Sequence, residues 1–127
     1  DGLDDLIASF TAVGLQVSLA QTQRPGTLRP GLDLVAYRVV QESLSNVLRH
    51  AGPVAVDVRL VVEAANLRID IVNAASRLAI DAGGGAKLGL IGLQERVQAL
   101  GGVLRHGPVE GGGFFVTATI PLTGGVP

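Results

Sequence analysis

Four polar side chains are spaced so that they share one face of a single helix. Arg38, Glu42, Asn46 and Arg49 fall within an arc of about 80°, with His50 at its edge, if each helical residue turns the chain by about 100°. A carboxylate, an amide oxygen and guanidinium groups can together hold a divalent cation and its phosphates, because Mg²⁺ prefers oxygen ligands. The alternative is a solvated helix face, and spacing alone does not decide between the two.

A second candidate is the glycine-rich segment 83–92, which runs directly into an expected helix. Free backbone N–H groups and the positive end of a helix suit an anion, although a mobile surface loop would have a similar composition. Within this segment, Lys87 is either a phosphate-facing charge or a solvated loop residue. The segment matches neither the P-loop pattern nor the glycine pattern that follows a Rossmann strand, so both of these sites are disfavoured.

Apolar periodicity predicts the elements that must position these residues. Helices are expected over 3–13, 32–50 and 88–100, and strands over 15–20, 54–62, 67–72, 103–106 and 114–121. Strands that pair as hairpins, with helices between them, predict an α+β fold. We expect a two-layer sandwich in which a mixed, largely antiparallel sheet carries the helices on one face, with residues 1–127 forming one domain.

Composition excludes several classes of function. The 127 residues carry 10 Lys plus Arg against 11 Asp plus Glu, which gives no overall electrostatic basis for binding nucleic acid. The absence of Cys removes disulfides and thiolate metal sites. No apolar run approaches the roughly 20 residues of a spanning helix, so we expect no direct membrane contact by this domain.

Four segments in order resemble the ATP-binding catalytic domain of two-component sensor histidine kinases, within the GHKL superfamily and nearest to its nitrate- and oxygen-sensor subfamily. They are residues 37–51, 67–73, 89–97 and 111–121. The resemblance covers nearly the whole chain, and the expected element order fits the Bergerat-type sandwich of that family. It implies a protein histidine kinase catalytic domain that uses ATP and Mg²⁺.

The resemblance implies a role for each residue near the end of the long helix. Asn46 matches the asparagine that ligates Mg²⁺, and Glu42 matches the acidic residue that assists phosphoryl transfer. Arg49 and His50 occupy positions that face the phosphates or the nucleotide. From the residues alone, His50 would instead be a cation at the helix terminus, stabilised by the helix dipole.

Other matches carry departures from the family pattern. Asn73 stands where the family has an aspartate that accepts a hydrogen bond from adenine, and residues 73–77 lack the usual two glycines. Gly89, Leu90 and Gly92 match a second glycine box, which opens a helix beside the phosphates. The segment between these boxes, 74–87, is expected to be a short ATP lid.

The implied function is to bind Mg-ATP and donate its γ-phosphoryl group to a histidine on a separate helical dimerisation domain, with a response regulator downstream. We expect a cytoplasmic fragment of a longer sensor, and we expect that this fragment cannot phosphorylate itself. Membrane-anchored and unanchored full-length sensors both agree with the sequence. One alternative is a degenerate module with weak or no nucleotide binding that acts as a docking or regulatory domain. A lower-ranked one is an anti-sigma-factor kinase that phosphorylates serine.

Overall fold

The fold alternates helices and strands in the order that the sequence predicts. A computed structural model describes residues 2–21, 31–74 and 84–122, without the side chains of 84–89. Its helices are α1 (Gly2–Ala12), α2 (Leu32–His50) and α3 (Gly84–Ala99), and its strands are β1 (Gln16–Gln21), β2 (Ala55–Glu63), β3 (Asn66–Asn73), β4 (Val103–Pro108) and β5 (Phe114–Pro121).

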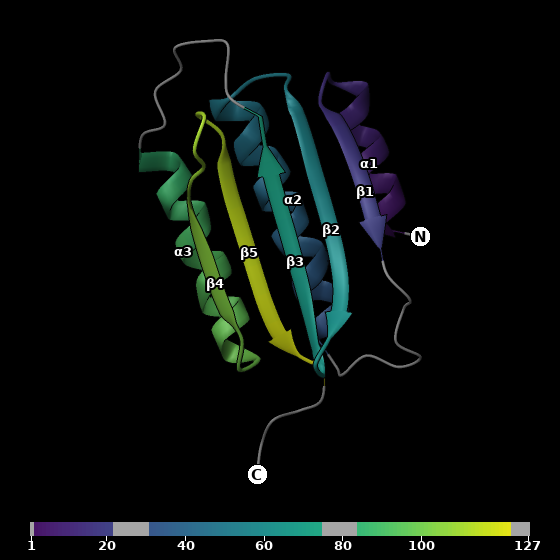
Figure 1. The fold of residues 1–127 in the computed structure, drawn as a ribbon, viewed down its shortest axis with the longest axis vertical. Helices are drawn as coiled ribbons and strands as arrows, with labels where there is room; N and C mark the ends of the chain where they lie inside the picture. Colours follow the sequence, from purple (N-terminus) through teal and green to yellow (C-terminus); the bar gives the residue numbers. More distant parts are fainter. Residues whose placement is uncertain (1, 22–30, 75–83, 123–127) are drawn as a thin grey trace.

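The five strands form one mixed sheet, and the three helices lie together behind it (Figure 1). The strand order is β1-β2-β3-β5-β4, with β1 and β2 parallel and every other neighbouring pair antiparallel. The predicted α+β architecture, with helices on one face of a largely antiparallel sheet, is therefore confirmed.

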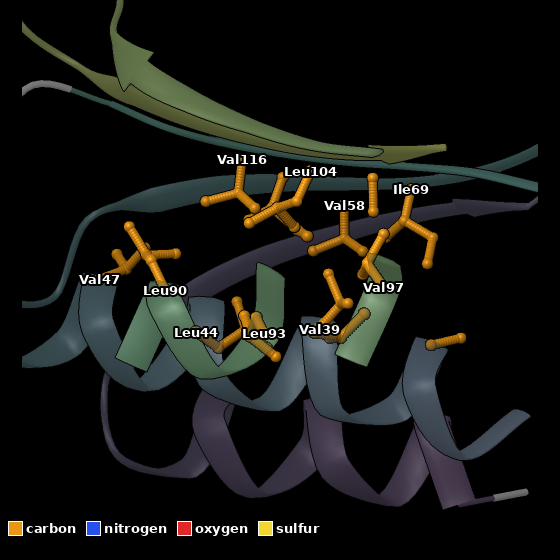
Figure 2. Close-up of a cluster of buried hydrophobic side chains, with 14 of the residues drawn as sticks. Val39, Leu44, Val47, Val58, Ile69, Leu90, Leu93, Val97, Leu104 and Val116 are labelled. Carbon is orange, nitrogen blue, oxygen red and sulfur yellow. The ribbon is translucent and has the colours of Figure 1, made fainter. Parts of the chain in front are cut away.

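The core fills the space between the sheet and the helices (Figure 2). Val58, Ile69 and Val116 come from the helix-facing side of the sheet, while Val39 and Leu93 come from the helices below it. The long helix α2 contributes apolar residues at helical spacing from Leu32 to Val47, and its buried face fixes the rotation of the opposite, polar face.

The hairpin between β2 and β3 closes through only two residues. Glu63 pairs with Asn66, and the intervening Ala64 and Ala65 adopt positive φ values of 49° and 64°. These angles are those of a type I′ turn, whose twist matches that of the flanking strands. The register of this hairpin places alternate residues of β3, ending at Asn73, on the helix-facing side of the sheet.

Helix α3 begins four residues earlier than predicted, at Gly84 rather than residue 88. Glycine is about 1 kcal/mol less favourable than alanine within a helix, so local propensity argues against this start. The next turns bury Leu90 and Leu93, and such tertiary packing overrides local propensity. The predicted lid over 74–87 is therefore wrong at its end, since 84–87 are helical, and its residues 75–83 lie outside the described residues.

Within the described ranges, no helix is both long and apolar enough to cross a bilayer.

Candidate nucleotide site

The polar strip of α2, which we define as Arg38, Glu42, Asn46, Arg49 and His50, faces the neighbouring helix α3. Helix α1 packs on the opposite side of α2, where a side chain on Gly2 would meet the Tyr37 ring at 3.8 Å. Tyr37 and Asn46 are nine residues apart, which places them about 180° apart around the helix. Because α2 also packs against α3, Asn46 is turned toward the α3 side.

Burial varies along the strip. Arg38 and Arg49 are exposed, whereas Glu42, Asn46 and His50 are half-buried. The Nη1 group of Arg38 donates to Gln41 Oε1 at 3.4 Å, and the Nη2 group of Arg49 donates to Ser45 Oγ at 3.0 Å. The two cations therefore lie at the outer edge of the strip, as groups that screen a bound anion would.

The side-chain oxygen of Asn46 is buried and has no hydrogen-bond partner among the described residues. Leaving a buried polar group unpaired costs about 1–3 kcal/mol, and more than nine in ten buried polar groups avoid it. An amide oxygen is a suitable ligand for Mg²⁺, which usually takes only one or two ligands from protein. The residues present therefore fit a cation held by Asn46, with Glu42 one turn away.

A buried polar residue next to the strip was missed by the sequence analysis. Ser43 is only 2% exposed, and its Oγ has no partner among the described residues. It continues the buried face of Ala36, Val40 and Val47, so a hydroxyl stands where the spacing calls for an apolar side chain. That mismatch was visible in the sequence.

Asn73 ends β3 with its side chain buried on the helix-facing side, in line with Ile69 and Ile71. Its Nδ2 group donates to the carbonyl oxygen of Ala74 at 2.8 Å, which leaves Oδ1 as the acceptor that this side chain can offer a ligand. Gly113 lies against the same backbone, because a side chain there would overlap the carbonyl oxygen of Asn73.

The glycine box does not open α3, contrary to the sequence-based expectation. The helix begins at Gly84, so Gly89, Leu90 and Gly92 lie in its second and third turns. The N–H groups of the first three residues of a helix have no acceptor within it, so free donors belong to residues 84–86. Lys87 lies in this first turn, and its side chain is outside the described part of the chain.

The side chain of Leu90 belongs to the core, where it lies beside Val47 beneath Val116 (Figure 2). Any contact of Leu90 with a nucleotide would therefore use its backbone. Gly92 is half-buried and has open space around its Cα. Steric crowding therefore does not require glycine at this position.

The open face of the sheet is a different environment from the strip. Arg68 donates to Asp70 Oδ1 at 3.1 Å and approaches Glu63, while the Thr117 hydroxyl donates to Asp70 Oδ1 at 2.9 Å. The hydrogen bond to Asp70 raises the pKa of the Arg68 guanidinium. A hollow of about 380 Å³ on this face, lined in part by Asp57 and Asp70, includes none of the predicted site residues.

Comparison with known proteins identifies relatives of this chain. It is 27% identical over 125 residues to the sensor histidine kinase LiaS of Bacillus subtilis. The aligned residues cover 96% of this chain and 34% of LiaS. The chain is 35% identical over 81 residues to the sensor histidine kinase NarS of Mycobacterium tuberculosis, covering 61% and 19%. No family model matches the chain.

Solved structures agree on the fold. The catalytic domain of the histidine kinase ThkA superposes with a TM-score of 0.72 at 12% identity, covering 97% of this chain and 92% of that domain. The Acinetobacter baumannii histidine kinase AdeS gives 0.73 at 15% identity, covering 96% and 64%.

The chain is homologous to sensor histidine kinases and has the fold of their catalytic domain. It spans about a third of the length of LiaS. In this histidine kinase fold, Ser43 and Asn73 are buried polar residues on the faces of α2 and β3 that pack together, while the buried oxygen of Asn46 lies on the α3 side of α2. The polar network of Arg68 and Asp70 lies on the other face.

Proposed function

We propose that this histidine kinase domain binds Mg-ATP and donates the γ-phosphoryl group to a histidine on a separate helical dimerisation domain, in the cytoplasm, with a response regulator downstream. The observation that carries the proposal is the buried Asn46 Oδ1, which has no partner among the described residues and lies on the α3-facing side of α2. A cation and its nucleotide would supply the missing interaction.

Every side chain of the strip except Arg38 has a part in this proposal. Asn46 would hold Mg²⁺, whose charge offsets that of the phosphates during transfer. Arg49, exposed at the outer edge, would stabilise phosphate oxygens through its fixed donors, and His50 would face the nucleotide beside it. Glu42 would orient the attacking imidazole or accept its proton.

The base would be held at the end of β3. Asn73 Oδ1 would accept a hydrogen bond from the adenine amino group, because Ala74 already engages the Nδ2 group. The free N–H groups of residues 84–86 would face the phosphates, with Lys87 in the same turn of α3. The box formed by Gly89, Leu90 and Gly92 would follow in the next turns.

Neither histidine of this chain suits the role of phosphoacceptor. His50 is half-buried in the last turn of α2. His106 lies on the edge strand β4, where its ring stacks on Phe114 with centroids 6.0 Å apart. The acceptor is therefore assigned to another domain.

The test is a labelling experiment with γ-³²P-ATP. This chain alone should stay unlabelled, and addition of its parent's helical dimerisation domain should give an acid-labile, base-stable phosphohistidine on that added domain. Label on His50 or His106 of this chain alone would contradict the proposed division of roles. Acid-stable label on a serine of a partner would favour the anti-sigma-factor type of kinase.

The loss of both glycines from residues 73–77 favours a second candidate, a degenerate module that docks or regulates without using nucleotide. This candidate predicts weak or no binding of Mg-ADP and no labelling of the dimerisation domain, while physical binding to that domain is retained. A pull-down with the dimerisation domain, run beside the labelling experiment, separates the two candidates.

A further inference from the structure

Two unpartnered oxygens lie one helical turn apart on α2. Ser43 Oγ and Asn46 Oδ1 are both buried, and neither has a hydrogen-bond partner among the described residues. Ser43 is 2% exposed as a whole residue. Ser45, on the same helix, differs in that its Oγ accepts a hydrogen bond from Arg49 at 3.0 Å. A buried serine in a helix usually donates to the carbonyl four residues earlier, but Ser43 makes no such bond.

The spacing of the two residues is one at which a single water can bridge two side-chain oxygens. Side chains at positions i and i+3 of a helix have Cβ atoms about 5–6 Å apart, on the same side of the helix. No hydrogen bond joins Ser43 Oγ directly to Asn46 Oδ1. A buried water needs two or more polar partners, and it lies about 2.8 Å from each oxygen that it bonds.

We propose that Ser43 is a positioning residue for the cation site. Its hydroxyl holds a water against Asn46 Oδ1 in the nucleotide-free protein. When Asn46 binds a cation, Ser43 Oγ accepts a hydrogen bond from a water of the cation's hydration shell. This second step rests on the proposed function. The proposed contact agrees with two general properties of metal sites. Bound Mg²⁺ retains several waters, and residues that hydrogen-bond to the metal's ligands strongly affect metal affinity.

The shared water is tested without nucleotide. A crystal structure of the wild-type protein at a resolution that shows ordered waters should place one within about 3.2 Å of both oxygens. The Ser43→Ala variant should fold, since it removes only an unpartnered hydroxyl, and should lose this water. Ser45→Ala is the matched control and should keep it. A wild-type structure without the water, or with Ser43 Oγ bonded to protein, overturns the proposal.

The positioning role is tested by measuring ADP binding at increasing Mg²⁺ concentration. Ser43→Ala should weaken the apparent Mg²⁺ affinity by about threefold to tenfold and leave metal-free ADP binding unchanged, since it acts on the outer shell. Ser45→Ala, which removes only the acceptor of Arg49, should keep the wild-type dependence on Mg²⁺. Equal Mg²⁺ dependence in Ser43→Ala and wild type overturns the role. Failure of wild type to bind Mg-ADP overturns the proposed function and the role together, while the shared water is decided by the crystal structure alone.

Discussion

Asn46 and Asn73 are the same residue type in two different states. Asn46 sits within α2 with a buried oxygen that has no partner among the described residues, whereas Asn73 ends β3 with its amide group bonded to Ala74. The polar atom on the helix is therefore left for a water or a ligand to satisfy, whereas the polar side chain at the strand end is stabilised by the neighbouring backbone. From this difference, we expect nucleotide affinity to depend more on the cation end of the site than on the base end.

The largest effect is expected from Glu42→Gln, because it acts on the chemical step. Phosphoryl transfer to the dimerisation domain should slow by roughly 10²-fold or more, while Mg-ADP affinity stays within about twofold. Rates of labelling at saturating Mg-ATP, beside calorimetric affinities, measure the two quantities. A loss of binding that accounts for the slower transfer would mean that Glu42 helps to ligate the cation.

Asn46→Ala should have the next largest effect, a loss of Mg-ADP affinity of roughly 10- to 100-fold, since a charge-assisted interaction is worth about 1.5–3 kcal/mol. The fold should be retained, and the unfolding temperature unchanged or higher. Arg38→Ala is the matched control, because Arg38 lies exposed on the same strip and bonds only to Gln41 in the described structure. Equal losses in both variants would show a general electrostatic effect and not ligation by Asn46.

Gly113→Ala tests the close approach at the end of β3. A methyl group there overlaps the Asn73 carbonyl, so the free energy of unfolding should fall by about 1–3 kcal/mol. Gly92→Ala is the control, because open space surrounds Gly92 within α3, and stability should rise by up to about 1 kcal/mol. Urea denaturation measures both. If Gly92→Ala is more stable and also loses nucleotide binding, the glycine box acts through its backbone as the resemblance implies.

The smallest effect is expected at the base end. Asn73→Asp should tighten ADP binding by about 1 kcal/mol through a charged acceptor, and should lower stability because the donor to Ala74 is lost. Asn73→Leu should weaken binding. Competition titrations with a fluorescent nucleotide measure the three proteins. Equal affinities across them would place the base elsewhere and would remove the contrast between the two asparagines.

Much of the fold was predictable because the Pro and Gly residues that end elements agree with the apolar periodicity between them. Pro30 and Gly31 before α2, and Gly52 and Pro53 after it, bound an apolar pattern whose ends the structure matches. The start of α3 was not predictable, since its glycines oppose a helix that the packing of later turns stabilises.

The candidate site was predictable only in part. The arc from Arg38 to Arg49 follows from helix geometry. Its orientation toward α3 depends on long-range packing between the helices, which residue spacing along the sequence does not predict. Ser43 was not predicted because it lies outside the polar arc, on the buried face of α2, where a hydroxyl is out of place. The roles of Arg49, His50, Lys87 and the glycines stay predictions.

The most direct test of the central claim is a calorimetric titration of the wild-type protein with ADP, once with Mg²⁺ and once with EDTA. If Asn46 holds a cation that joins the nucleotide to α2, binding should be saturable with one site in Mg²⁺ and at least about tenfold weaker in EDTA. Equal affinities in the two conditions, or no heat in either, would contradict the claim that this strip is a metal-nucleotide site.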